Sequence, residues 1–167
     1  IRFKDMIVNF NGLTNLLTNV EFDNCEIHIQ GTVTLGQSST SKQGFIAKNS
    51  RIEINVVNNV PINVSLPTTI NQALFDNCKF ICGTVATIIN ADFRDCEISF
   101  LNGGTFTNVN IDPSSVTIGA ALNVTNTSIS DSTITVNVQR AFNIAGNNFT
   151  LEKNIISYAP SSLTGFT

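Results

Sequence analysis

The side chains of this chain that could perform acid–base chemistry are six carboxyl groups close to a recurring motif. They are Asp23, Asp76, Asp92, Asp95, Glu26 and Glu97. Catalysis by such groups, as in cleavage of a glycosidic bond, requires two carboxyl groups roughly 5–10 Å apart. Here turn chemistry accounts for Asp95, and exposure to solvent accounts for most of the others. The sequence therefore nominates no catalytic residue and favours a non-enzymatic chain over an enzyme.

Residues that could bind a metal are equally sparse. The spacings of the four cysteines match no zinc-binding pattern, and a single histidine, His28, cannot complete a site. The cysteines are Cys25, Cys78, Cys82 and Cys96. His28 lies between two inward-facing residues of a predicted strand, so we interpret it as an ordinary exposed histidine. We expect no bound metal and no cofactor.

The surface of the protein must be largely uncharged. Charged residues are 13% of the 167 residues, whereas 23 Asn, 19 Thr and 14 Ser make up a third of the chain. Charged residues are usually ~25% of a soluble domain, and a neutral polar surface is common in extracellular and virion proteins. The net charge is −3 and the basic residues are scattered singly, so no nucleic-acid partner is expected. No apolar run reaches the ~20 residues of a membrane span.

The strands predicted to position these residues belong to a sequence repeat. A two-pentad unit occurs eight times: IRFKD-MIVNF (1–10), VEFDN-CEIHI (20–29), FIAKN-SRIEI (45–54), ALFDN-CKFIC (73–82), ADFRD-CEISF (91–100), GTFTN-VNIDP (104–113), LNVTN-TSISD (122–131) and FNIAG-NNFTL (142–151). Its fifth position is always Asn, Asp or Gly, which tolerate a left-handed backbone. The predicted ladder of turn residues is Asp5, Asn24, Asn49, Asn77, Asp95, Asn108, Asn126 and Gly146.

Apolar and polar residues alternate on both sides of this turn. The pattern predicts a short strand, a bend and a second short strand, with alternate side chains pointing inward. In the three most similar copies the residues predicted to stack in the core are Phe22, Cys25, Ile27, Phe75, Cys78, Phe80, Phe93, Cys96 and Ile98.

The spacing of the copies indicates the architecture. Measured at the third position, the steps are 19, 25, 28, 18, 13, 18 and 20 residues, and the connecting stretches show no helical period. A turn of about 18–25 residues with three short strands is one coil of a single-stranded parallel β-helix. We predict an all-β solenoid of about eight coils over residues 1–157, with a constant Asn/Asp/Gly bend and variable other turns. Residues 158–167 are predicted to form a tail or partial cap.

This pattern resembles the right-handed parallel β-helix of the pectate-lyase-like superfamily, in which one sharp bend, often carrying an Asn ladder, is constant from coil to coil. The pentad ADFRD also fits the consensus of pentapeptide-repeat proteins, but those keep a near-constant coil length, which this chain does not. The resemblance is one of architecture. It implies carbohydrate-active enzymes on one side, and phage tail spikes, fibres and adhesins, often trimeric, on the other.

If the fourth and fifth copies, which are 18 residues apart, stack as adjacent coils, the sequence predicts which of their residues are direct neighbours. Equivalent residues of adjacent coils are roughly 4.8 Å apart. Asp76 should therefore neighbour Arg94, and Lys79 should neighbour Glu97. Cys78 should stack on Cys96 at a distance that permits a disulfide, but we favour reduced thiols because buried cysteine usually behaves as a small hydrophobe.

Two insertions, residues 30–44 and 55–72, are the longest connections and carry no acid–base pair, so we assign them to surface contacts or an inter-chain interface. Four Asn-x-Ser/Thr sequons begin at Asn63, Asn123, Asn126 and Asn148; in so Asn-rich a chain chance accounts for most of them. A regular Thr-x-Thr column is not evident, so an ice-binding solenoid ranks last.

Taken together, these features favour a structural or adhesive β-helix on an extracellular or virion surface, with a phage tail fibre or spike as the leading hypothesis. The expected partners are other protein chains, in a homotrimer or a stacked assembly, and a surface glycan. A polysaccharide lyase or glycoside hydrolase and a secreted bacterial adhesin are the alternatives. Because a strand begins at once after Ile1, we also expect this end to continue an upstream segment or to meet a partner.

Overall fold

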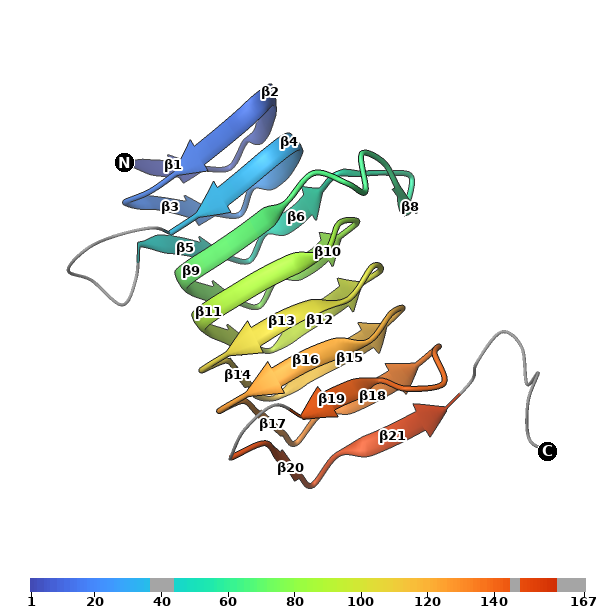
Figure 1. The fold of residues 1–167 in the computed structure, drawn as a ribbon. Coiled ribbons are helices and arrows are strands. Elements are labelled where there is room, and N and C mark those ends of the chain that lie inside the picture. The colour runs from blue at the N-terminus through green and yellow to red at the C-terminus, as the bar shows by residue number, and fades with distance from the viewer. Residues whose placement is uncertain (37–43, 145–147, 159–167) are drawn as a thin grey trace.

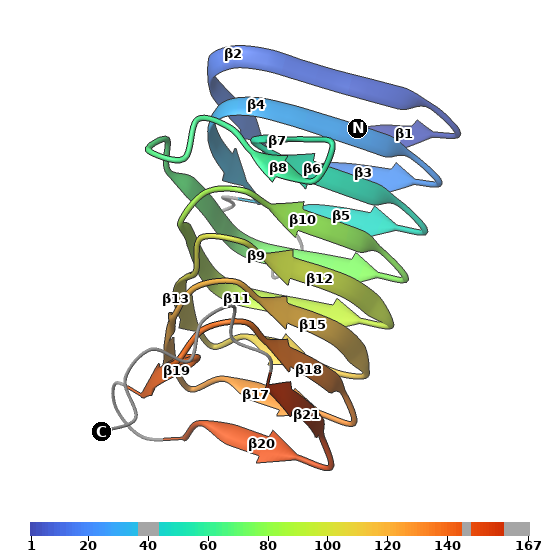
Figure 2. The same ribbon diagram turned by 90° about the vertical axis from the view of Figure 1, so that its right-hand side faces the viewer.

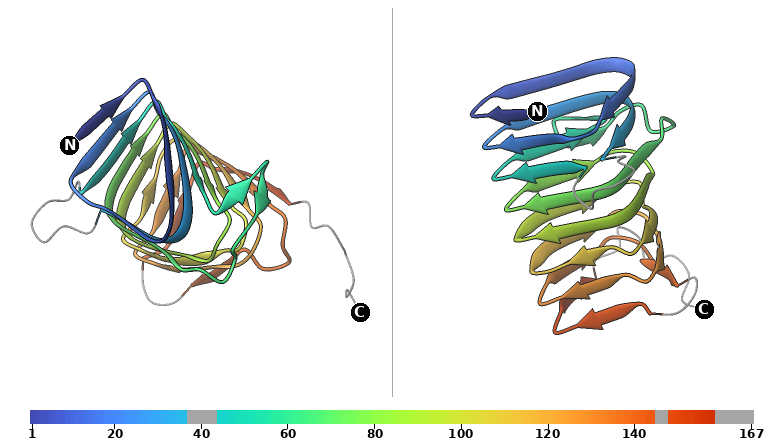
Figure 3. Two further views of the ribbon diagram at one scale, coloured as in Figure 1. Left: turned by 90° about the horizontal axis from the view of Figure 1, so that it is seen from above. Right: turned by 90° about the vertical axis from the view of Figure 1, so that its left-hand side faces the viewer.

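A computed structural model describes residues 1–36, 44–144 and 148–158 and shows an all-β parallel solenoid of about eight coils (Figure 1). The predicted fold class is thus confirmed. Seen from above, the coils overlie one another around a single interior (Figure 3). The described residues contain no helix long and apolar enough to cross a bilayer.

Each coil has three sides, which we call faces A, B and C. Face A contains β1 (Arg2–Lys4), β3 (Val20–Asp23), β5 (Phe45–Lys48), the second halves of β9 (Thr68–Asp76) and β11 (Ala86–Arg94), β14 (Asn110–Ile111), β17 (Ser128–Ser130) and β20 (Thr150–Glu152). Face B contains the first halves of β2 (Ile7–Leu17) and β4 (Glu26–Leu35), then β6 (Arg51–Ile54), β10 (Lys79–Cys82), β12 (Cys96–Phe100), β15 (Ser114–Ile118), β18 (Thr133–Val136) and β21 (Ile155–Tyr158).

Face C contains the second halves of β2 and β4, the first halves of β9 and β11, and then β13 (Gly104–Thr107), β16 (Leu122–Thr125) and β19 (Phe142–Ile144). Outside these faces, β7 (Val56–Val57) and β8 (Val60–Pro61) form a small antiparallel hairpin. The hairpin projects from the side of the stack (Figure 2).

The register agrees with the sequence prediction. Asp76 pairs with Arg94, and Lys79 with Glu97. The Lys79 ammonium lies 2.6 Å from the Glu97 carboxylate. The Arg94 guanidinium instead contacts Asp92, two residues earlier on its own strand, at 3.1 Å.

The interior is filled by alternate residues of all three faces, and a run of phenylalanines dominates its first coils. Phe75 and Phe93 stack at 4.6 Å with nearly parallel rings. In the third coil a phenylalanine and an alanine change places between two inward rows. Ala47 stands between Phe22 and Phe75 in their row, and Phe45, which lies between Val20 and Ala73, supplies the missing ring.

The predicted turn residues do not form one ladder. Asp5, Asn24, Asn49, Asn77 and Asp95 lie at the corner from face A to face B, all with φ between 50° and 55°. Asn108 and Asn126, with φ of 55° and 47°, lie instead at the corner from face C to face A. Gly146 is outside the described residues.

The reason for this correction is that both corners use left-handed Asn. Asn19, Asn90 and Asn148 also have positive φ at the C–A corner, and Asp131 and Lys153 take the A–B corner in the later coils. The last three sequence copies therefore begin on face C instead of face A, one side too early in the coil.

The two predicted insertions are shorter than expected. Within 30–44, residues 30–35 belong to strand β4, and residues 37–43 lie outside the described residues. Within 55–72, the hairpin occupies residues 56–61 and Thr68 begins strand β9. The predicted tail, apart from Tyr158 at the end of β21, also lies outside the described part.

Candidate functional site

The cysteines belong to an inward-facing column directly after the A–B corner. Its members are Cys25, Ser50, Cys78, Cys96, Ser114, Ser132 and Asn154. Several of these side chains accept a hydrogen bond from the backbone N–H of the preceding member: Cys25 N–H donates to Ser50 Oγ (3.0 Å), and Ser132 N–H to Asn154 Oδ1 (3.0 Å). Most also donate to the carbonyl two residues earlier, as Cys96 Sγ does to Arg94 (3.0 Å). Through these hydrogen bonds the column connects neighbouring coils beside the A–B corner.

All four cysteines are buried and carry free thiols. Hydrogen bonding with Cys96 and burial both raise the pKa of the Cys78 thiol, and burial raises that of Cys82. A nucleophilic cysteine needs a stabilised, accessible thiolate. Cys78 and Cys82 have the opposite environment, so their role is in packing.

The six candidate carboxyl groups are spread along the stack, and most are paired with basic groups. Asp23 contacts Arg2 at 3.0 Å, and Glu97 contacts Lys79 at 2.6 Å. Hydrogen bonds to Asp23 from Asn49 and Arg2 lower its pKa. Asp92 contacts Arg94, and Asp76 and Asp95 lie at the end of face A and at its corner. Charge pairing accounts for Asp23, Asp92 and Glu97.

His28 points outward as predicted, but it is part of an ion cluster. Its Nδ1 lies 3.0 Å from Glu53 Oε2 and its Nε2 lies 3.1 Å from Glu26 Oε1. Arg51 also contacts the Glu53 carboxylate, with its Nε at 3.0 Å. The Glu53 side chain is only 8% exposed. In the described residues no group of three or more His, Cys, Asp or Glu side chains is arranged to hold a metal ion.

Sequence reasoning missed Glu53, because the cluster forms only when Glu26 and His28 of β4 lie beside Arg51 and Glu53 of β6. The two strands are 25 residues apart, a step that the repeat alignment already contained. Alternating charge in the two aligned pentads, CEIHI and SRIEI, was the available signal.

A different surface covers the last coils. Its members are neutral hydroxyl and amide residues from face C, the C–A corner and face A: Thr105, Thr107, Asn108, Asn110, Asn123, Thr125, Asn126, Ser128, Asn148 and Thr150. We call this set the amide–hydroxyl face. It includes three of the four sequon asparagines, Asn123, Asn126 and Asn148.

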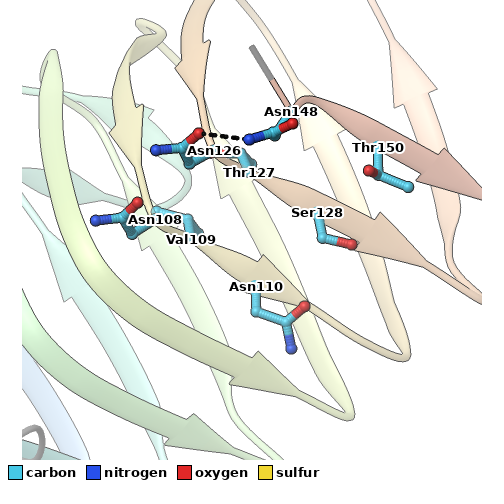
Figure 4. Close-up of a pocket in the computed structure, with 8 residues that line it drawn as sticks. All are labelled: Asn108, Val109, Asn110, Asn126, Thr127, Ser128, Asn148 and Thr150. Carbon is cyan, nitrogen blue, oxygen red and sulfur yellow. Dashed lines mark hydrogen bonds between the residues drawn. The ribbon is translucent and has the colours of Figure 1, made fainter.

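A shallow depression of about 410 Å³ lies on this face. Asn108, Asn126 and Asn148 line it at the corner, and Asn110, Ser128 and Thr150 line it along face A (Figure 4). The amide of Asn148 donates to Asn126 Oδ1 at 3.4 Å, so neighbouring coils orient each other's amides.

Face C extends the polar pattern toward the N-terminal coils. Thr34, Thr69, Thr87 and Thr105 are direct neighbours in one outward row, which continues through Asn123 to Asn143. Three of these threonines recur at 18-residue steps in the sequence, a signal that could have found the row. The row holds one threonine per strand.

Comparisons with protein-family models, curated proteins and solved structures find no match for this chain. The coarse architecture, a parallel β-solenoid, therefore stands on the structure itself.

Proposed function

We propose that this chain is a non-enzymatic structural and adhesive β-solenoid of an extracellular or virion appendage, and that its amide–hydroxyl face binds a neutral surface glycan. The observation that carries the proposal is the contiguity of these uncharged side chains across β13, β16 and the first outward row of β14, β17 and β20, formed by Asn110, Ser128 and Thr150.

The chemistry of the face suits sugar hydroxyls. Ser and Thr hydroxyls and Asn amides each donate and accept hydrogen bonds, as sugar hydroxyls do. Here they stand on strands spaced about 4.8 Å apart, whose buried neighbours Phe106, Val124 and Ile129 hold the backbone in place. A ligand that meets such a preorganised surface loses little additional protein entropy on binding.

The scaffold suits a mechanical role. A hydrophobic core runs through the described coils, and parallel strands join every coil to the next. A resemblance to the right-handed β-helices of the pectate-lyase-like superfamily, which include phage tail spikes and fibres, supports an appendage on which copies associate as a trimer or a stack.

The test is a glycan array probed with the purified chain, followed by turnover assays on every glycan that binds. We expect binding without cleavage. The double variant Asn108→Asp and Asn126→Asp keeps residue types that tolerate the left-handed corner but places two carboxylates on the face. It should weaken binding at least about tenfold, because desolvated carboxylates replace amides that donate to the ligand.

Asn137→Asp is the matched control, because Asn137 is exposed and lies outside the amide–hydroxyl face. It should bind like the wild type. Absence of binding across the array, or equal weakening by the control, contradicts the proposal.

A carbohydrate-active enzyme is the second candidate, and the Glu26–His28–Glu53–Arg51 cluster is the observation that favours it. The nearly buried Glu53 and the more exposed Glu26 flank one imidazole. Cleavage of an array glycan that is abolished by Glu53→Gln would replace the adhesive proposal with this one.

A further inference from the structure

The hairpin formed by β7 and β8 is the one antiparallel pair of strands in the described residues, and its shape is well defined. Asn58 and Asn59 at its tip have φ of 51° and 63°, the two left-handed residues that a type I′ turn requires. At its base the Ile62 N–H donates a hydrogen bond to the Asn55 carbonyl oxygen at 2.8 Å, and Val56 is buried. The turn and the base together fix the position of the tip relative to the coils.

The hairpin lies in front of β6 on face B (Figure 2). Glu53 and Ile81 are neighbours in one outward row of this face, and the residues on either side of each are buried in the core. Although they point outward, Glu53 and Ile81 are only 6% and 4% exposed. Ser99 and Thr117, which follow in the same row, are half-buried. The part of the row that the hairpin covers therefore ends between Ile81 and Ser99.

A cavity of about 210 Å³ lies where this cover ends. The residues that line it are Asn59 at the tip of the hairpin and, on the side of face B, Lys79, Ile81, Glu97, Ser99 and Leu101. We call it the hairpin cavity. Pockets for drug-sized ligands have volumes of about 300–1,000 Å³, so the hairpin cavity suits a smaller ligand, of the size of one sugar ring.

The hairpin cavity combines polar groups with an apolar floor. In the described part of the chain neither the Asn59 amide nor the Ser99 hydroxyl hydrogen-bonds to another residue, so both are available to a ligand. The Lys79 ammonium donates to one oxygen of Glu97 at 2.6 Å, which leaves two ammonium hydrogens and the second carboxylate oxygen. Ile81 and Leu101 supply apolar surface beside these groups.

We propose that the hairpin cavity binds the terminal N-acetylated sugar of a glycan. An acetamido group carries a methyl group, one N–H donor and one carbonyl acceptor. The methyl group matches Ile81 and Leu101, and the amide matches Asn59, whose side chain both donates and accepts. The ring hydroxyls then meet Ser99 and the Lys79–Glu97 pair. This inference takes its class of ligand from the proposed glycan binding, but its site on face B is distinct from the amide–hydroxyl face.

Titration of the isotope-labelled full chain with methyl β-N-acetylglucosaminide, followed by NMR, tests the proposal. We expect shifts of the Asn59 side-chain amide signals and of the Ser99 backbone signal that saturate as the sugar is added. Methyl β-glucoside has a hydroxyl in place of the acetamido group. It should bind at least about tenfold more weakly, because it leaves the apolar floor uncovered and the Asn59 amide without a partner.

Two pairs of matched variants locate the site. Asn59→Gly keeps the left-handed turn and removes the amide, and Asn58→Gly makes the same change at the turn residue that does not line the cavity. Ser99→Ala removes a lining hydroxyl, and Thr117→Ala removes the next hydroxyl of the row, outside the cavity. The two lining variants should each weaken binding of the N-acetylated sugar about twofold to tenfold, the range for one lost hydrogen bond. The two controls should bind like the wild type.

Absence of shifts at Asn59 and Ser99, equal binding of the two sugars, or equal weakening by the controls overturns the proposal. The glycan array separates it from the proposed function. Array binding that is lost in Asn59→Gly but unchanged in the Asn108→Asp and Asn126→Asp variant supports the hairpin cavity and contradicts the role of the amide–hydroxyl face. Array binding that only the double variant weakens, without shifts at Asn59, overturns the hairpin cavity and leaves the proposed function standing.

Discussion

Residues 1–97 and residues 98–158 build coils of the same design but cover them with different side chains. The first region holds sixteen of the 21 charged residues, among them the Lys79–Glu97 ion pair and the two carboxylates that contact His28 in the Glu26–His28–Glu53 cluster. The second region presents Asn, Ser and Thr. In a parallel stack every residue has an equivalent about 4.8 Å away, so like charges in one row repel. One outward row of the first region, formed by Lys4, Asp23, Lys48, Asp76 and Arg94, alternates in sign, and the second region carries five of the 21 charged residues.

The cores of the two regions differ as well. Phenylalanine rings contact one another from Phe3 to Phe106. From Val109 to Val136 the buried apolar residues are aliphatic. Left-handed corners occur in both regions. The fold therefore depends on such corners and on apolar inward residues, whether these are aromatic or aliphatic, and not on whether the outward residues are charged.

Removing a ring from the aromatic core should give the largest loss of stability. Phe93 is fully buried and contacts Phe75, Phe80 and Phe100. Phe93→Ala should lower the free energy of unfolding by about 3–5 kcal/mol, and Ile129→Ala in the aliphatic core by about 2–5 kcal/mol with a smaller cavity. Urea denaturation of both variants measures the two losses. A greater loss for Ile129→Ala would show that the aromatic stack is not the better-packed core.

In the first region a buried side-chain amide forms hydrogen bonds to two backbone groups at the turn after β6. Asn55 is fully buried; its side chain accepts from Gly31 N–H and donates to Gly31 O, both at 2.8 Å, and its φ is 51°. Asn55→Leu should cost about 1–3 kcal/mol for the two unsatisfied backbone groups and about 1–2 kcal/mol for the left-handed backbone. Asn55→Gly, which removes only the hydrogen bonds, should lose less in the same urea titration. Equal losses would mean that the backbone conformation contributes nothing.

The sequence predicted the core and the register better than the corners. Phe22, Phe75 and Phe93 face inward as expected, and the 18-residue step correctly paired Lys79 with Glu97. The single ladder was wrong because Asn occupies two of the three corners, so the pentad pattern fits both. The 13-residue step to Asn108, too short for a coil, was the sign of a shift by one face.

The candidate site was only partly readable from the sequence. The 18-residue step between the sixth and seventh copies placed Asn108 beside Asn126 and Asn110 beside Ser128, as the structure has them. The eighth copy misplaced Thr150, which pairs with Ser128, and the mistaken corner hid that the amide–hydroxyl face spans faces C and A. The repeat alignment also set His28 against Glu53, but an alignment of positions does not by itself show that the two side chains are in contact.

The exposed ion pairs should contribute little individually. A double-mutant cycle with Lys79→Ala and Glu97→Ala should give a coupling of at most about 1 kcal/mol, because both side chains reach solvent. The coupling should fall in high salt. Thr117→Ala with Thr135→Ala, neighbours in an outward row of the neutral region, is the comparison and should show no salt dependence. A coupling that survives 1 M salt would contradict this account.

The smallest expected effect is on the pH dependence of stability, through the Asp23 carboxyl group of the first region. Hydrogen bonds from Asn49 and Arg2 hold the pKa of Asp23 below its ordinary value of 3.8. A carboxyl group with a lowered pKa in the folded state adds stability above its unfolded pKa and loses it as the pH falls through the folded value. The urea midpoint of the wild type should therefore drop more between pH 5 and pH 2 than that of Asp23→Asn. Parallel curves for the two proteins would rule out this contribution.

The row of alternating charge has a consequence for how such a protein changes length. If one coil were lost or duplicated between Lys4 and Arg94, two residues of the same sign would become neighbours in the row formed by Lys4, Asp23, Lys48, Asp76 and Arg94. Deletion or tandem duplication of a single coil therefore sets like charges side by side in this row, whereas a change of two coils preserves the alternation. The outward row of face C that runs through Thr105, Asn123 and Asn143 carries no such parity.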